Sequence, residues 1–196
     1  QFTTGGNLNI ALRSPIPNFD VHSEFSPALT SLGPGIIYSR LLRYQSGENL
    51  NSPNLLIECE LCSSWTQIDP TTIVFYLRPD IRWQNLDPVN GRRLIAQDII
   101  DSYTRQQTLN WPNAPLLENI LKMEAPNDLT LKMKLRVPDA DFLRSLADGH
   151  SKVIAPEVLY SYPNLSDGPN VGSGPWILSE YDKHLFFKFH RNNNYF

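Results

Sequence analysis

Short runs of alternating hydrophobic and polar residues follow one another along the chain and are separated by turn residues. Successive side chains of a β-strand point to opposite faces, so this alternation predicts strands with one buried face. Six segments have this alternation or a β-branched and aromatic composition and are predicted strands: residues 7–12, 71–78, 120–124, 129–135, 176–182 and 185–191. The APND sequence after residue 124 and the turn at Lys183 predict that the last four segments form two hairpins.

Apolar residues recur with helical spacing in two places. In the segment 94–106 this spacing predicts the clearest helix of the chain, with Asp98 in its first turn, where a negative charge meets the helix dipole favourably. A second helix is predicted to begin near Pro34, because apolar residues follow with helical spacing and proline suits a first turn. The sequence DADFLRSLADG predicts a third, short helix that Gly149 closes.

The composition is that of a globular protein. With 196 residues, 41% hydrophobic and 19% charged, the chain can bury a core in one domain or two small ones. The formal charge of −3, without any block of like charge, gives no electrostatic reason to expect nucleic acid or an anionic membrane as a partner. No run of apolar residues is long enough to span a membrane, and QFTTGGNLNI lacks the features of a signal peptide, although a processed start fits the sequence.

The two cysteines of the chain form a C-x-x-C sequence, Cys59 and Cys62. Glu58 and Glu60 flank the pair and disfavour the thiolate that redox chemistry needs. A closed zinc site needs about four ligands, and none of the four histidines has the H-x3-H spacing. The favoured interpretation is structural, either a local disulfide or two buried thiols, and redox or metal chemistry is the alternative.

Residues that could carry catalysis are scarce. The sequence has no G-x-S-x-G, no H-E-x-x-H and no glycine-rich phosphate loop, because GSGPW lacks the following lysine. Asp139 and Asp141 are more simply a helix cap and a turn than a catalytic pair. The sequence therefore predicts no enzyme. Trp111, in a predicted loop, is the tryptophan with the best claim to a ligand-binding wall, and simple packing is the alternative.

The order of several motifs carries a family resemblance. These motifs are the segment CELCSSWTQIDPTTIVFYLRPDIRW, then NGRRLIAQDIIDSYTR, then MEAPNDLTLKMKLRVPDADFLRSLA, then VGSGPWILSEYD, and finally RNNNYF. In sequence and spacing they resemble the oligopeptide and dipeptide substrate-binding proteins of ABC importers, the solute-binding family 5. The chain departs from the family pattern at Cys59 and Cys62, where the family has proline and alanine, at Ile95 in place of a capping threonine, and at Val21 in place of a proline.

The resemblance implies an α/β fold, a lobe of the type II periplasmic-binding-protein kind with mixed sheets and short helices, of which the chain is the N-terminal part. It implies a first core segment at residues 1–44, an inserted α/β subdomain at 45–167 and a core return segment at 168–196, with the chain ending before the second lobe. The final hairpin would then expose a strand edge that self-association or another chain must cover.

The function that the resemblance implies is capture of peptides, or similar small solutes, between two lobes and their delivery to the membrane subunits of an ABC importer. It implies an extracytoplasmic location, periplasmic or at the cell surface, with a lipid anchor in the full-length protein. Neither a cofactor nor a metal ion is expected. By position, the family's main-chain ligand contacts correspond to Phe25, Ser26 and Pro27. An ordinary loop leading into the next helix is the alternative for these three residues.

Two other functions remain open from the sequence. A sensor or regulatory domain can use the same fold to report on a ligand without transporting it. A thiol or metal module would use Cys59 and Cys62.

Overall fold

A computed structural model describes residues 5–13, 15–16, 18–47, 55–162, 164–166, 168–182 and 184–196. The helices are α1 (Pro27–Ser31), α2 (Ala96–Gln106), α3 (Phe142–Ala147) and α4 (Pro156–Ser161), with the 3-10 turns η1 (Pro34–Ile37) and η2 (Ala114–Leu117). The strands are β1 (Leu42–Tyr44), β2 (Ile57–Cys59), β3 (Cys62–Asp69), β4 (Thr72–Leu77), β5 (Ile120–Asn127), β6 (Thr130–Leu135), β7 (Trp176–Asp182) and β8 (Phe186–Arg191). No helix in the described residues is long and apolar enough to cross a membrane.

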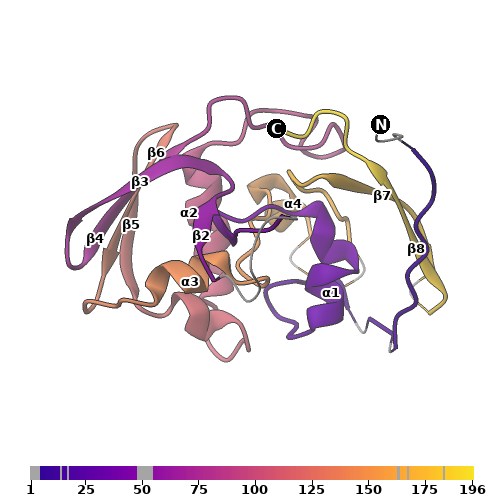
Figure 1. Ribbon diagram of the computed structural model, residues 1–196, viewed down its shortest axis with the longest axis horizontal. Helices are drawn as coiled ribbons and strands as arrows, with labels where there is room; N and C mark the ends of the chain where they lie inside the picture. Colours follow the sequence, from indigo (N-terminus) through magenta and orange to yellow (C-terminus); the bar gives the residue numbers. More distant parts are fainter. Residues whose placement is uncertain are drawn as a thin grey trace.

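The strands of the described residues form three antiparallel sheets. The largest has the order β3-β4-β6-β5, and the other two are the pairs β1-β2 and β7-β8. The four-stranded sheet lies at one end of the molecule, the hairpin β7-β8 at the other, and α1 and α4 between them (Figure 1). The buried hydrophobic residues nevertheless form one continuous core from Ile16 to Val171.

The four-stranded sheet follows directly from the alternation in the sequence. In β6 the side chains of Leu131, Met133 and Leu135 are buried and face the core, while the residues between them are partly exposed. Phe75 of β4 lies opposite Leu131, and α2 packs against β5 and β6. Burial of one face by a helix is what an antiparallel sheet with one apolar face requires. The predicted strand at 71–78 and the hairpin of β5 and β6 are confirmed.

Helix α2 is fixed at its start by one buried carboxylate. Asp98 accepts hydrogen bonds from the backbone N–H of Ile95 at 3.0 Å and from Nε1 of Trp83 at 3.1 Å. Arg92 donates to both of its carboxylate oxygens, at 2.8 and 2.9 Å. The carboxylate thus satisfies a backbone donor that a helix start leaves unpaired, although Ile95 itself has no capping side chain. The predicted helix is confirmed.

Two predictions for the N-terminal part are wrong. The predicted strand at residues 7–12, a segment that the structure describes in full, is not a strand, and Leu8 and Ile10 are 84% and 56% exposed. The predicted helix near Pro34 is only the turn η1, since the following residues are drawn into extended structure: Arg40 pairs with Lys152, and β1 pairs with β2. Pairing with distant segments outweighs the local helical spacing.

Strand β3 was not predicted. Its sequence CSSWTQID is mostly polar, and six of its eight residues are exposed. Its position follows from the backbone ladder to β4, in which Trp65 lies opposite Phe75. An edge strand that faces water on one side needs few apolar residues, so hydrophobic pattern alone does not reveal it.

The C-terminal hairpin of β7 and β8 is confirmed. Within the described residues, its two strands pair only with each other. Phe19 packs on the hairpin, with ring centroids 5.1 Å from Tyr181 and 5.5 Å from Phe187 in edge-to-face geometry. Trp176 and Phe186 remain nearly half exposed, at 43% and 48%.

The glycines before β7 allow two backbones to touch. A Cβ atom on Gly172 would lie 2.1 Å from the carbonyl oxygen of Ile37, and one on Gly174 would lie 2.6 Å from the same oxygen. The N–H of Gly174 donates to that oxygen at 2.7 Å. Gln84, which is buried, joins the contact by donating to the carbonyl of Trp176 at 2.7 Å.

Replacing Gly172 by alanine is therefore expected to destabilise the chain by about 1–3 kcal/mol, the usual cost of overpacking against a backbone that cannot move away. Denaturant unfolding measures this change. Gly149→Ala is the matched control, because a Cβ there meets only the side chain of Thr30, with Oγ1 at 3.4 Å and Cβ at 3.6 Å, which are ordinary contacts. Equal midpoints for the two variants would contradict the proposed role of the Gly172 contact.

Candidate functional site

The segment 18–25, which contains the start of the predicted ligand contact, is folded into a tight turn by its own polar side chains. The N–H of Asp20 donates to Oδ1 of Asn18 at 2.8 Å, and the N–H of His22 donates to Oδ1 of Asp20 at 3.1 Å. The backbone N–H of Glu24 donates to the carbonyl of Asp20 at 2.9 Å. Asp20 and His22 are both buried. The turn therefore depends on buried polar groups, which must be paired elsewhere in the fold.

Arg105, in the last turn of α2, supplies that pairing. It forms an ion pair with Asp20, with Nη1 2.9 Å from Oδ1, and the same nitrogen lies 3.1 Å from Nδ1 of His22. Nε2 of His22 lies 2.8 Å from the carbonyl oxygen of Lys152. This geometry fits a neutral imidazole that donates through Nε2 and accepts through Nδ1.

The surroundings of Asp20 and His22 shift the pKa values of both residues. Burial raises the pKa of Asp20, but its hydrogen bonds and charge interaction with Arg105 outweigh burial, so that the pKa lies below its usual value. Burial, together with the positive charge of Arg105, lowers the pKa of His22 to about 4. At neutral pH, Asp20 is thus ionised and His22 is neutral.

Asn113 holds the same turn from a second side. Its Nδ2 lies within hydrogen-bonding distance of three carbonyl oxygens, those of Val21 (3.1 Å), His22 (3.1 Å) and Glu24 (2.9 Å). Asn113 is fully buried and precedes the turn η2. Arg105 and Asn113 lie more than 80 residues along the chain from the turn that they fix.

The three predicted ligand contacts follow this turn directly. Ser26 caps α1, since its Oγ accepts from the N–H of Leu29 at 3.3 Å and its carbonyl from the N–H of Thr30 at 3.1 Å. Pro27 is the first residue of α1. Ser26 and Pro27 thus help to begin α1. This role agrees with the alternative interpretation, in which these residues are a loop that leads into the next helix.

Three backbone groups at the same place are left without a partner. The N–H and C=O of Phe25 and the N–H of Ser26 make no hydrogen bond within the part of the chain that the structure describes. The side chain of Phe25 is 64% exposed and stacks on the imidazole of His150, with centroids 4.8 Å apart and an interplanar angle of 11°. We call Phe25, Ser26 and His150 the wall.

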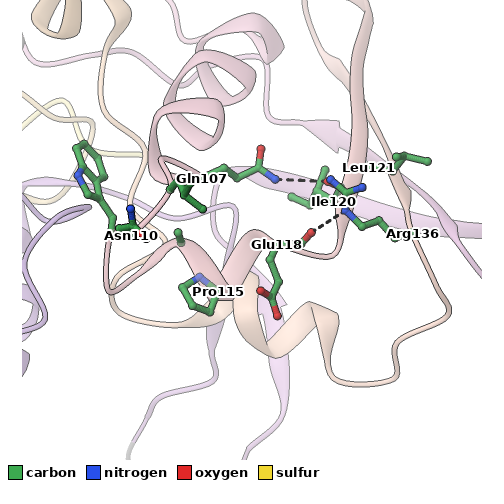
Figure 2. A pocket seen from close by; sticks show the side chains of 10 residues that line it. Gln107, Asn110, Pro115, Glu118, Ile120, Leu121 and Arg136 are labelled. Carbon is green, nitrogen blue, oxygen red and sulfur yellow. Dashed lines mark hydrogen bonds between the residues drawn. The ribbon is translucent and has the colours of Figure 1, made fainter.

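Trp111 contacts Arg105, which fixes the turn before the wall. The guanidinium carbon of Arg105 lies 4.6 Å from the centroid of the Trp111 ring, a cation–π contact. The indole is half-buried and lines an open depression of about 500 Å³ at the end of α2. Gln107, Ile120 and Arg136 also line the depression (Figure 2).

The depression is shaped by hydrogen bonds to the backbone. Nε2 of Gln107 donates to the carbonyl of Ile120 at 3.4 Å, and Nε of Arg136 donates to the carbonyl of Glu118 at 3.1 Å; Figure 2 shows both interactions. Leu109 and Leu121 at its border are 82% and 55% exposed. The depression is thus open and partly apolar, and it is separate from the unpaired backbone groups of the wall.

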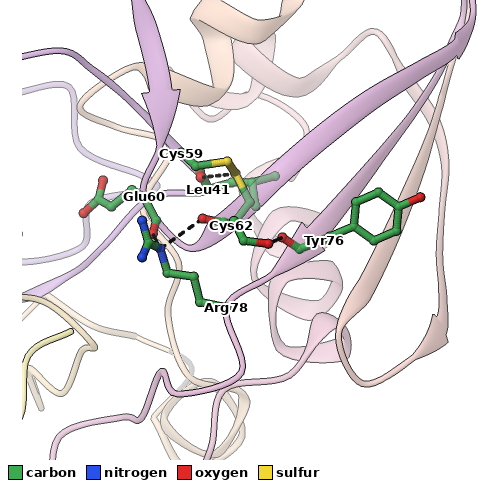
Figure 3. Close-up of a disulfide and its surroundings, with 7 residues drawn as sticks. Leu41, Cys59, Glu60, Cys62, Tyr76 and Arg78 are labelled. Atoms are coloured by element: carbon green, nitrogen blue, oxygen red, sulfur yellow. Dashed lines mark hydrogen bonds between the residues drawn. A yellow bond between two sulfur atoms is a disulfide. The ribbon is translucent and has the colours of Figure 1, made fainter.

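Cys59 and Cys62 form a disulfide between the end of β2 and the start of β3. Nε of Arg78 donates to the carbonyls of Glu60 and Cys62, each at 3.1 Å, and so closes the same bend (Figure 3). The disulfide holds the connection between the small sheet and the four-stranded sheet. Cysteines joined in this way do not act as metal ligands.

Sequence reasoning did not identify His150 of the wall, nor the residues that position the wall: Asp20, His22, Arg105, Asn113 and Asp148. Each lies far along the chain from a partner or belongs to no recognised motif. The one local signal is DGH at residues 148–150, in which Asp148 Oδ1 accepts from the backbone N–H of His150 at 2.8 Å and lies 2.9 Å from its Nδ1.

Solved structures share this fold. The substrate-binding domain of an oligopeptide ABC transporter from Bacillus anthracis superposes with a TM-score of 0.79 at 20% identity, covering 95% of this chain and 38% of that chain. The periplasmic binding protein DppA from Helicobacter pylori, solved with the peptide STSA, has a TM-score of 0.74 at 21% identity and covers 91% and 37%. The fold is therefore that of a lobe of a periplasmic binding protein, and the fold implied by the sequence resemblance is confirmed.

The family follows from the sequence. The profile of the bacterial extracellular solute-binding proteins, family 5 (middle region), matches residues 57–196, and the chain belongs to this family. This is a family of solute-binding rather than catalytic proteins. The HTH-type transcriptional regulator SgrR from Salmonella typhimurium strain LT2 is 32% identical over 135 residues, which is 69% of this chain and 22% of SgrR. The chain thus spans about a fifth of the length of that curated relative.

Proposed function

We propose that this chain provides one wall of the solute-binding site of an ABC importer, and that the solute is a peptide or a similar small molecule. The unpaired N–H and C=O of Phe25 and the unpaired N–H of Ser26 carry this proposal. An extended peptide offers complementary groups along its main chain, so such a wall binds it without regard to side-chain identity. The Arg105 and Asn113 contacts support this role, because they fix the wall before a ligand arrives.

In the whole protein, the proposed mechanism is closure of a second lobe over the solute, followed by docking of the closed form on the membrane subunits. The proposed division of the chain is 1–44 and 168–196 in the core subdomain and 45–167 in an inserted subdomain. The hairpin β7-β8, whose strands pair only with each other among the described strands, is proposed as the place where a second copy or another chain would pair. Trp111 is proposed as an outlying part of the ligand wall, and it contacts Arg105, which pairs with Asp20 in the turn before Phe25.

The proposed location is extracytoplasmic, with a lipid anchor in the full-length protein. The Cys59–Cys62 disulfide supports export, because disulfides persist in oxidising compartments.

Titration of a mixed di- to pentapeptide pool into the ¹⁵N-labelled chain tests the peptide proposal. The backbone amides of Phe25 and Ser26 are expected to shift first, at millimolar peptide. Pools of neutral sugars at equal concentration serve as the control. Shifts confined to the depression beside Gln107 and Ile120, or no shifts at all, would contradict the proposed wall.

A ligand-sensing domain of a regulator is the second candidate function. The likeness to the transcriptional regulator SgrR favours it. Thiol titration of chain recovered from its native cells under non-reducing, alkylating conditions separates the two candidates. No free thiol is expected for an exported binding protein. Two free thiols per chain would favour a regulator in a reducing compartment.

A further inference from the structure

His150 carries a hydrogen-bonding atom that the fold does not use. His150 as a whole is 7% exposed, and Nε2 is buried without any hydrogen-bond partner in the described part of the chain. A buried polar atom without a partner is uncommon and costs about 1–3 kcal/mol. The fold alone therefore does not explain why Nε2 of His150 is buried without a partner.

The other ring nitrogen determines what Nε2 can do. Nδ1 lies 2.9 Å from Oδ1 of Asp148, whose carboxylate can only accept. In the neutral imidazole the proton therefore sits on Nδ1, and Nε2 presents a lone pair. The backbone N–H of His150 also donates to Oδ1 of Asp148, which fixes the orientation of the ring.

Phe25 covers one face of this ring. Phe25 is itself 64% exposed, so this side of the imidazole lies near the surface. It belongs to the residue whose backbone N–H and C=O are unpaired. A solute that bonds to the backbone of Phe25 thus arrives beside the imidazole.

We infer that Nε2 of His150 accepts a hydrogen bond from a main-chain amide N–H of the peptide that binds at Phe25 and Ser26. This inference rests on the proposed function and adds a specific polar contact to it. His150 is then a ligand-binding residue, and Asp148 is a positioning residue that acts through it.

The ¹⁵N chemical shift of Nε2 of His150 reports this contact directly. The probes are trialanine and an analogue with both amide nitrogens methylated, each titrated into the ¹⁵N-labelled chain at millimolar concentration. Trialanine is expected to shift the Nε2 resonance of His150, whereas the methylated analogue leaves it in place. The Nε2 resonance of His22, which already faces the carbonyl of Lys152, is the internal control.

A matched variant gives a second measurement. His150→Phe retains an aromatic ring for Phe25 to stack on but removes the acceptor. The dissociation constant of trialanine, from the shift titration of the Ser26 amide, is expected to rise about three- to tenfold, the value of one net hydrogen bond. The weaker binding of the methylated analogue should not change. If this variant does not fold, the wild-type Nε2 spectrum still decides the question.

The outcomes separate the inference from the proposed function. If trialanine shifts the amides of Phe25 and Ser26 but not Nε2 of His150, the wall stands and the inference fails. The inference also fails if both probes shift Nε2 equally, because no amide donor is then needed. If trialanine shifts no resonance, the proposed peptide function fails and the inference fails with it.

Discussion

Replacing Asp20 by alanine is expected to destabilise the chain by about 3–5 kcal/mol, the usual cost of breaking a buried ion pair. The change leaves the guanidinium of Arg105, whose side chain is 13% exposed, without its carboxylate. It also removes the acceptor of the His22 N–H. Urea unfolding followed by tryptophan fluorescence measures the loss. In the same variant the backbone amide of Phe25 should shift, because the turn before it is no longer fixed.

The matched control is Asp141→Ala. Asp141 and Arg144 form an ion pair with side chains 73% and 54% exposed. Exposed pairs contribute about 0–1 kcal/mol, so this variant should unfold close to the wild type. Comparable losses in both variants would mean that the cluster around Asp20 does not hold the wall.

Lowering the pH from 7 to 4 is expected to cost about 3 kcal/mol of stability through His22 alone. The pKa of this residue falls from 6.5 to about 4 on folding, first because of burial and then because of Arg105. The unfolded chain therefore binds a proton at His22 below pH 6.5, whereas the folded chain resists it until about pH 4. Stability is fully present above this window and is lost as the pH falls through it.

The groups that face His22 do not reverse this trend. The pKa of Asp20 lies below its usual value, so its contribution is lost in the same direction at still lower pH. The pKa of Lys152, whose carbonyl contacts His22, is lowered by burial to about 8, and its titration falls above the window.

His22→Gln isolates the effect, since the amide can donate to the Lys152 carbonyl and does not titrate. Unfolding free energies at pH 7, 6, 5 and 4 measure the slope. The variant should lose about 3 kcal/mol less than the wild type between pH 7 and pH 4. Parallel pH profiles for the two proteins would show that His22 is not buried as a neutral imidazole.

The hydrophobic pattern of the sequence predicted those elements that bury one apolar face. Alternation in β6 and helical spacing in α2 each describe one apolar face that is buried in the structure, so both elements were predictable. The same alternation failed at residues 7–12, because no described segment pairs with them. Hydrophobic periodicity shows which face a segment could bury, but it does not show whether another strand or helix packs against that face.

The candidate site was predictable only in part. The family resemblance pointed to Phe25, Ser26 and Pro27, and the predicted loop pointed to Trp111, which contacts Arg105 of the Asp20–Arg105 cluster. The residues that give this region its chemistry were not visible in the sequence, because Arg105, Asn113 and His150 act on a turn about 80 to 130 residues earlier. Their polar atoms acquire a role only through tertiary burial, which a single sequence does not encode as a pattern.

The affinity of this chain by itself tests the central claim, that its wall is one side of a two-lobed site. A peptide on an open wall loses conformational freedom, at about 0.5–1.5 kcal/mol for each ordered flexible side chain, while it keeps only part of its contacts. Calorimetric titration of a mixed di- to pentapeptide pool should therefore give no saturable heat at micromolar concentration, with binding in the millimolar range or weaker. A saturable, one-to-one micromolar complex would show that these 196 residues contain a complete site and would contradict the two-lobe account.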